Sequence, residues 1–269
     1  MAKTADAPTT ILVIDVGNTN IVLGLYEGSS LRALWRAATN REQTADEYGI
    51  LIHNFFAWEK LPVTEIRGIM IASVVPPMNP VLAEMARKYF QMEALFLEPG
   101  TRTGMAILVD NPQEVGADRI ADAVAAFEKY GGPCIVMDFG TAITFDCISQ
   151  KGEYLGGVIM PGIGIAAEAL FERTAKLPRV EFREPERVIG TNTISHIQSG
   201  LFYGAVDAVD GMLGRLFAVL GNHTKVIATG GQASLVAGAS KYKPVIDSSL
   251  TLDGLRIIYY RNQPGSRRK

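Results

Sequence analysis

Two short polar turns, far apart in the sequence, each combine an aspartate with a glycine and a hydroxyl residue. They are Asp15–Thr19 (DVGNT) and Asp138–Thr141 (DFGT). Backbone N–H groups at such a turn can surround phosphate oxygens, while glycine allows close approach and threonine adds a hydrogen bond. Either turn alone could equally be a hairpin with a capping aspartate. The second copy favours a nucleotide bound by two phosphate loops, with Asp15 placed to hold Mg²⁺ through water.

The segment Asp110–Arg119 (DNPQEVGADR) is a second candidate for chemistry. Asp110 or Asn111 can cap a helix that has Pro112 at its first position. Gly116 would then lie inside the first turns, where glycine costs about 1 kcal/mol relative to alanine. Such a cost is expected where another group approaches the backbone closely.

Asp118 and Arg119 are adjacent, so on a helix they point about a quarter turn apart. They can therefore contact different parts of one ligand. The alternative is a solvated charged face that also includes Asp122, and the segment alone would favour it.

The elements that must position these turns repeat along the chain. Asp15 and Asp138 lie 123 positions apart, and each follows an apolar strand and precedes a second strand. The predicted strands are 11–14, 21–26, 66–74, 135–137, 143–148, 154–160 and 225–228, and the predicted helices are 45–56, 80–90 and 194–220. The repeat predicts an α/β protein of two similar lobes, each opening with a β-hairpin whose turn faces the other lobe.

Other phosphate-binding patterns are weaker. The chain has no GxxxxGK[ST] motif, which disfavours a P-loop fold. Residues 162–167 match GxGxxA, but the preceding strand is expected to pair in a hairpin rather than to open a βαβ unit. We therefore expect these glycines to form a loop that enters a helix near the site. A dehydrogenase, which this motif would suggest, is the least favoured alternative.

Two further segments flank predicted helices. Asn192 or Thr193 is expected to cap the long helix, with a substrate contact as the alternative role for Thr193. Residues 228–232 (ATGGQ) form a predicted strand-to-helix turn, where a flat base could lie against the backbone. The three histidines show no ligand spacing, so surface or capping roles are expected for them.

Composition excludes several classes of protein. The 269 residues carry a net charge of −2, which argues against a non-specific nucleic-acid binder. The two cysteines, Cys134 and Cys147, lie in apolar runs and are expected to be buried, reduced thiols. The N-terminal residues lack an apolar signal segment, and residues 11–25 are interrupted by polar side chains. We therefore expect a cytoplasmic protein with no membrane or nucleic-acid partner.

The ordered set DVGNTN, GADR, DFGTA, PGIG, GTNT and ATGG resembles the type III pantothenate kinase family over about residues 11–255. The resemblance implies the superfamily of acetate and sugar kinases, actin and heat-shock chaperones. The expected fold is a pair of actin-like (ribonuclease H-like) lobes, residues 1–126 and 127–269, with ATP in the cleft between them. The implied reaction is transfer of the γ-phosphoryl group of ATP to pantothenate, giving 4′-phosphopantothenate for coenzyme A synthesis.

The resemblance also implies roles for residues. The general base would be Asp118, and Asp138 would hold a monovalent cation, potassium or ammonium. The family is homodimeric, with substrate bound near the subunit contact. ATP would be bound by Asp15, Val16, Gly17, Asn18, Thr19, Asn20, Ile21, Val22, Thr141, Gly230 and Gly231, and pantothenate by Gly116, Ala117, Asp118, Arg119 and Thr193.

One position departs from the family pattern. Many relatives carry a tyrosine just before the Asp-Asn-Pro segment, whereas this chain has Val109. The change puts in doubt one side wall of the substrate pocket. Two alternatives stay open at this point: a kinase of the same superfamily that acts on another hydroxy acid or sugar, and a catalytically silent accessory factor that binds ATP without turnover.

Overall fold

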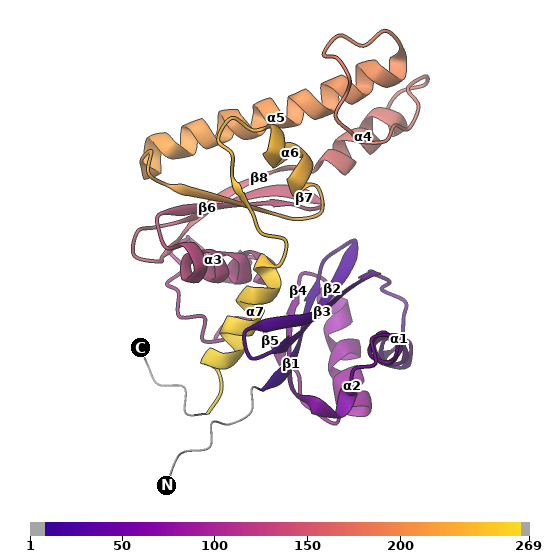
Figure 1. Cartoon of the computed structure of the whole chain (residues 1–269), viewed down its shortest axis with the longest axis vertical. Helices are drawn as coiled ribbons and strands as arrows, with labels where there is room; N and C mark the ends of the chain where they lie inside the picture. Colours follow the sequence, from indigo (N-terminus) through magenta and orange to yellow (C-terminus); the bar gives the residue numbers. More distant parts are fainter. Residues whose placement is uncertain (1–8, 265–269) are drawn as a thin grey trace. The chain divides into compact units, whose positions relative to one another are not determined.

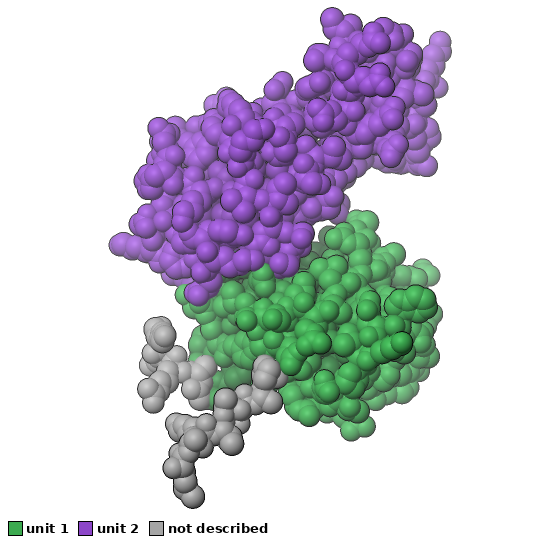
Figure 2. All heavy atoms as spheres, in the orientation of Figure 1, with its two compact units in different colours: residues 1–104, 111–125, 251–269 green, residues 105–110, 126–250 purple. Residues whose placement is uncertain are grey.

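The computed structural model describes residues 9–264, which form two compact units. Within that range, the first unit contains residues 9–104, 111–125 and 251–264, and the second contains 105–110 and 126–250 (Figure 2). Residues 251–264 thus belong with the first unit, and residues 105–110 with the second. The lobe boundary expected after residue 126 stays a prediction.

The first unit is built on a five-stranded mixed sheet with the strand order β3-β2-β1-β4-β5 (Figure 1). β2 pairs antiparallel with β1 and β3, whereas β4 runs parallel to β1 and β5. Its strands are β1 (Thr10–Val16), β2 (Asn20–Glu27), β3 (Ser30–Ala38), β4 (Ile66–Ser73) and β5 (Leu95–Phe96). Its helices are α1 (Ala45–Trp58), α2 (Asn79–Phe90) and α7 (Leu250–Arg261), with short 3₁₀ turns at Val63–Glu65, Pro76–Met78 and Pro112–Glu114.

The second unit has a sheet of the same design, with the order β10-β9-β6-β7-β8. β7 pairs antiparallel with β6 and β8, and β9 runs parallel to β6 and β10. Its strands are β6 (Cys134–Phe139), β7 (Ala142–Ile148), β8 (Tyr154–Pro161), β9 (Lys225–Thr229) and β10 (Val245–Ile246). Its helices are α4 (Ile163–Glu172), α5 (Thr193–Leu220) and α6 (Ala233–Ala239), while α3 (Ala117–Tyr130) begins in the first unit and ends in the second.

The two sheets therefore share one topology, strand for strand. β1 corresponds to β6, β2 to β7, β3 to β8, β4 to β9 and β5 to β10. Asp15 and Asp138 occupy the same place, one residue before the end of the central strand of each sheet. The duplication predicted from the two turns is confirmed.

Alternate residues of a strand point to opposite faces of its sheet, and both faces of the central strands β1 and β6 are buried. In the first unit, Leu12, Ile14 and Val16 of β1 belong to a core that includes residues of α1 and α2 (Figure 1). In the second, Ile135, Met137 and Phe139 of β6 pack with α5 and α6. Asp15 and Asp138 have the opposite parity, so both point to the other face of their sheet.

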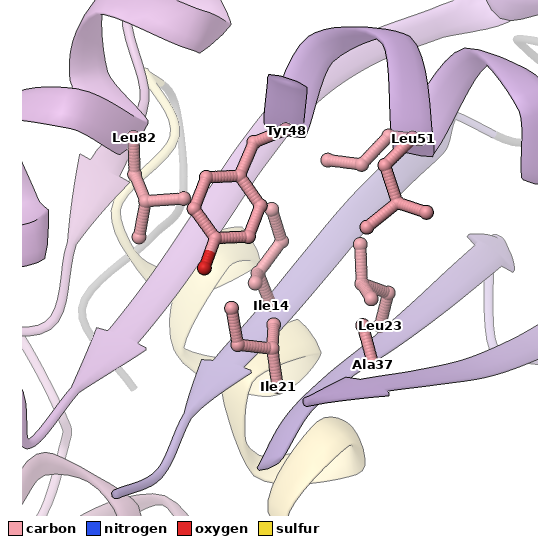
Figure 3. A pocket seen from close by; sticks show the side chains of 8 residues that line it. Ile14, Ile21, Leu23, Ala37, Tyr48, Leu51 and Leu82 are labelled. Atoms are coloured by element: carbon pink, nitrogen blue, oxygen red, sulfur yellow. The ribbon is translucent and has the colours of Figure 1, made fainter. Parts of the chain in front are cut away.

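A small void in the first core contains only apolar surface. Ile14, Ile21 and Leu82 line it, and the ring of Tyr48 forms one wall (Figure 3). The Tyr48 hydroxyl is turned to the backbone oxygen of Asn40, at 2.8 Å. Since no polar group borders the void, we interpret it as a packing gap beneath the first turn rather than a ligand site.

Four elements were not predicted, namely the strands β3, β5 and β10 and the helix α7, and one helix begins later than expected. The segments that form β3 and α7 have only weak hydrophobic periodicity, yet β3 pairs along its length with β2. The expected helix start at Pro112 is wrong, because Pro112–Glu114 is a 3₁₀ turn and α3 begins only at Ala117. Asn111 caps the short turn through the N–H of Gln113, at 3.3 Å. Gly116 therefore precedes α3 instead of lying inside it.

The cysteines agree with the sequence-based expectation. Cys134 and Cys147 are buried free thiols. Burial raises the pKa of the Cys134 thiol to about 12, so it stays protonated and unreactive at neutral pH. Among residues 9–264, no helix combines the length and the apolar character that crossing a bilayer requires.

Candidate active site

The first turn is a tight connection between β1 and β2. The N–H of Gly17 donates to the backbone oxygen of Asn20 at 3.0 Å, and Asp15 pairs in register with Val22. The side chains at the tip, Asn18 and Thr19, are exposed. Gly17 has little room for a side chain, since a Cβ there would lie 3.1 Å from the Asn20 oxygen. The close packing of the turn therefore favours glycine at this position, and the phosphate contact of the tip stays a prediction.

Residues just after β3 hold this turn in shape. Thr39 donates from its N–H to the oxygen of Thr19 at 2.9 Å and from its hydroxyl to the oxygen of Gly17 at 2.6 Å. Arg41 donates to the side-chain oxygen of Asn18 at 2.9 Å. Sequence reasoning missed Thr39 and Arg41, because they carry no motif and become neighbours of the turn only through β3.

Asp118 lies at the start of α3, on the same unit as the first turn. An ideal Cβ on Gly116 would lie 2.4 Å from the Asp118 Oδ1 and 3.6 Å from Val74, so glycine leaves room for the carboxylate. Val74 in turn donates its N–H to the oxygen of Val16 at 3.0 Å. The close approach predicted at Gly116 is therefore that of the Asp118 carboxylate, beside the strand end that carries Asp15.

The electrostatic setting of Asp118 suits proton transfer. Burial raises the pKa of its carboxyl above the ordinary value, and this effect outweighs the opposing influence of Arg119. The N–H of Arg119 donates to Oδ1 at 2.8 Å and fixes the carboxylate. A carboxylate with a raised pKa is a stronger base than an ordinary one.

The second turn connects β6 and β7 and is one residue shorter than the first. Phe139 pairs with Ile143, and the N–H of Gly140 donates to the oxygen of Ala142 at 3.0 Å. Thr141 is exposed at its tip. Gly162, the second residue of the PGIG motif, approaches this turn so closely that a Cβ would lie 2.1 Å from the Thr141 oxygen. α4 begins directly after Gly162, so Gly164 lies in the helix and the loop expected for these glycines is limited to its entry.

Asp138 has close neighbours on both adjacent strands. It pairs in register with Thr144 of β7 and with Thr229 of β9. Gly230 follows β9 with a φ of +94°, and a Cβ there would lie 2.3 Å from the Asp138 Oδ1. The structure thus brings Gly230 of the ATGG motif against the carboxylate of the second turn. Gly231 is the next residue, and it is exposed.

Thr193 occupies the first position of α5 and is exposed. The cap is Asn192, whose side chain accepts the N–H of Ser195 at 3.0 Å. His196 contacts the backbone oxygen of Gly190 at 3.2 Å, a role close to the capping role expected for it. The capping role of Thr193 is thereby excluded, and its role as a substrate contact stays a prediction.

The sequence-predicted residues thus gather in two groups. Residues 15–22 and 116–119 lie on the first unit, where Val74 neighbours both Val16 and Gly116, and Asp138, Thr141 and Gly230 lie together on the second. The first group joins a phosphate-type turn to a basic carboxylate. The second joins a phosphate-type turn to a carboxylate flanked by hydroxyl residues. Each group contains parts that a phosphoryl-transfer site needs.

Comparison with known proteins agrees with this arrangement. The sequence profile of the type III pantothenate kinase family matches residues 11–215. A type III pantothenate kinase of Koribacter versatilis is 54% identical, covering 96% of this chain and 98% of the relative. One of Solibacter usitatus is 53% identical, covering 94% and 97%.

Solved structures show the same fold at low sequence identity. A Listeria monocytogenes protein assigned as an N-acetylmannosamine kinase superposes with a TM-score of 0.54 at 11% identity, covering 95% of this chain and all of that one. This chain therefore shares its duplicated, actin-like fold with that protein. From the profile and the close relatives, the chain belongs to the type III pantothenate kinase family.

Proposed function

We propose that this protein transfers the γ-phosphoryl group of ATP to the primary hydroxyl of pantothenate, giving 4′-phosphopantothenate, the first step of coenzyme A synthesis. Family membership over nearly the whole chain supports the reaction. The structural observation that carries it is the Asp118 carboxylate, set in the space that Gly116 leaves beside the first turn.

Asp118 acts as the general base in this proposal. Its carboxylate accepts the proton of the attacking hydroxyl, and its raised pKa makes it a better acceptor than an ordinary aspartate. Arg119 binds the pantothenate carboxylate through its guanidinium, which suits a planar anion. Gly116, Ala117 and Thr193 complete the pantothenate contacts.

The two turns bind ATP. Residues 15–22 offer backbone N–H groups and the Thr19 hydroxyl to phosphate oxygens, and Thr141 offers a hydroxyl from the second turn. Gly230 and Gly231 present a backbone without side chains to the adenosine. Phosphoryl transfer asks a protein chiefly for positioning and for positive charge on the transferring oxygens.

Two cations fit the donor atoms. Asp15, at a strand end beside the first turn, would hold Mg²⁺ through water. Asp138 would hold a potassium or ammonium ion through its carboxylate oxygens, and the absence of a side chain at Gly230 lets the turn after β9 lie directly against Oδ1. When bound, both ions supply positive charge that offsets the charge of the phosphates.

We further propose a cytoplasmic homodimer that binds neither membrane nor nucleic acid. The net charge of −2 supports the absence of a nucleic-acid partner. Gly200, Gly204 and Gly211 follow one face of the 28-residue helix α5, and a Cβ at any of them would meet no atom within 4 Å. A second copy could pack closely on this stripe, and sedimentation of Gly204→Gln would test it through loss of the dimer.

A substrate panel tests the proposed reaction. ADP release is measured with pantothenate, N-acetylmannosamine, glucosamine and glycerate, and the phosphorylated product is identified by mass. Pantothenate alone should give rapid turnover. Asp118→Asn should lower kcat by about 10²–10⁴-fold, the usual contribution of a general base. Asp110→Asn, an exposed aspartate of the neighbouring segment, is the matched control and should keep its rate.

A further inference from the structure

A row of side chains crosses the second sheet at the level of Asp138. In register, Thr229 lies opposite Asp138 on β9, Thr144 lies opposite it on β7, and Ile159 lies opposite Thr144 on β8. Side chains directly opposite one another share a face, with Cβ atoms about 4.5–5.5 Å apart. The largely buried Thr144 therefore stands next to the carboxylate of Asp138.

Behind Thr144 lies a carboxylate with no exposed surface. Asp146, two residues further along β7, accepts the hydroxyl of Thr144 on Oδ2 at 3.3 Å. Its other oxygen accepts the hydroxyl of Tyr154 at 2.5 Å. A buried charge is costly unless it is well hydrogen-bonded, so a carboxylate at this position calls for an explanation beyond packing.

The direction of the Thr144 hydrogen bond decides what its hydroxyl oxygen can bind. A hydroxyl has one hydrogen and two acceptor lone pairs. Because Thr144 gives its hydrogen to Asp146, its oxygen is left as an acceptor. A hydrogen bond to a charged acceptor also polarises the hydroxyl and makes its oxygen more negative. The Thr144 hydroxyl oxygen next to Asp138 can therefore bind a cation, but it has no hydrogen left to donate to another acceptor.

We infer that the Thr144 hydroxyl oxygen is a second ligand of the monovalent cation held by Asp138, and that Asp146 is the positioning residue that keeps this oxygen available. The inference rests on the proposed role of Asp138. Oxygen donors, charged and neutral, are those that hard cations prefer. No sequence motif singles out Thr144 or Asp146; the register and the burial do.

The test uses variants that separate the contribution of the Thr144 hydroxyl oxygen from that of side-chain shape. Thr144→Val keeps the volume but removes the oxygen, and Thr144→Ser keeps the oxygen but removes the methyl group. Asp146→Asn keeps the shape of the positioning residue but removes its charge. The matched control is Thr251→Val on α7, whose hydroxyl also donates to a buried carboxylate, that of Asp122 at 2.7 Å, in the other unit.

The main readout is the rise of the unfolding temperature with KCl in the absence of substrates, compared with choline chloride at equal ionic strength. The KCl concentration for half-maximal rate is measured in parallel. Asp146→Asn should raise the KCl concentrations for half-maximal thermal shift and half-maximal rate by about 10–100-fold, as loss of outer-shell support does at metal sites. Thr144→Val, which removes the ligand itself, should raise both concentrations by at least as much. Thr144→Ser should stay within about threefold of the wild type. Thr251→Val should lower the unfolding temperature in choline and leave the potassium response unchanged.

Asp138→Asn separates failure of the inference from failure of the proposed function. If Asp138→Asn loses the potassium response while Thr144→Val keeps it, Asp138 holds the ion without Thr144 and the inference is wrong. If the wild type responds to neither potassium nor ammonium, the proposed role of Asp138 and the inference both fall. Should Asp146→Asn not fold, the Thr144→Val and Thr144→Ser pair decides the question.

Discussion

The backbone of Gly230 lies so close to Asp138 that a Cβ on the glycine would stand 2.3 Å from the carboxylate Oδ1. The same Cβ would stand 2.6 Å from the backbone nitrogen of Phe139. The strand-to-helix turn after β9 and the strand end of β6 therefore fit together only if residue 230 has no side chain. This contact joins two segments that lie about ninety residues apart in the sequence.

We expect Gly230→Ala to displace the Asp138 carboxylate. The φ of +94° also disfavours alanine, so the free energy of unfolding should fall by about 1–3 kcal/mol. The potassium requirement and the KM for ATP should both rise. Denaturant unfolding and steady-state kinetics measure the two effects.

Gly238→Ala is the control for this substitution. Gly238 lies in α6, where an added Cβ would meet no atom within 4 Å. Alanine there should raise the free energy of unfolding by about 0.5–1 kcal/mol and leave the kinetics unchanged. Equal kinetics for Gly230→Ala and the wild type would show that the contact does not position Asp138.

The raised pKa of Asp118 predicts a shifted pH profile. A base must be deprotonated, so kcat/KM should rise with pH through the pKa of Asp118 in the free enzyme. Because burial raises that pKa, the midpoint should lie above about 4, the ordinary value for aspartate. A profile that is already flat from about pH 4 upward would contradict the assignment.

The same shift predicts that Asp118→Asn is not destabilising at neutral pH. A carboxyl whose pKa is raised on folding contributes stability at low pH, and the contribution is lost as pH rises through the folded-state pKa. At pH 8 the charged, buried carboxylate therefore opposes folding, and asparagine relieves this cost. Urea unfolding at pH 8 should give the variant a free energy of unfolding equal to or above that of the wild type. A clear loss of stability at that pH would mean that the carboxylate is well solvated or paired.

The pKa shift of Asp247 predicts the opposite dependence of stability on pH. Burial by itself would raise the pKa of Asp247, but bonds from Lys129, Tyr130 and the Ser249 N–H outweigh it and hold the pKa below its ordinary value. Lys129 lies at 2.5 Å and the Tyr130 hydroxyl at 2.8 Å. The stability that these bonds contribute is present at neutral pH and is lost as pH falls through the lowered pKa.

Asp247→Asn should therefore lower the free energy of unfolding at pH 7 by about 1–3 kcal/mol. The difference from the wild type should shrink below about pH 4, where the unfolded carboxyl is protonated. Glu184→Gln, at an exposed position, should change little at either pH. A penalty for Asp247→Asn that did not vary with pH would point to packing rather than charge.

Much of the fold was predictable because its signals are local. The apolar strands before Asp15 and Asp138, and the turns after them, lie in contiguous residues, and their repetition predicted the duplicated sheets. β3 could not be found this way, because its exposed positions blur the alternation and only pairing with β2 defines it. α3 began late because the Pro112 signal belongs to a separate 3₁₀ turn.

The candidate site was predictable to the extent that motifs carry it. Gly116 and Asp118 were singled out by residue type and spacing, although the sequence did not show which group approaches the backbone of Gly116. Arg41 and Thr144 were missed, because Arg41 reaches the first turn only through β3 and Thr144 meets Asp138 only through strand register. Contacts of this kind depend on tertiary pairing, which short-range patterns do not encode.

The most direct test of the central claim is pantothenate-dependent release of ADP by the purified protein with Mg²⁺ and potassium, with wild type and Asp118→Asn assayed side by side. The proposed function predicts steady turnover by the wild type, a product heavier than pantothenate by one phosphoryl group, and nearly complete loss of turnover with ATP binding retained in Asp118→Asn. ATP binding by the wild type with no phosphorylated pantothenate, or full turnover by Asp118→Asn, would contradict it.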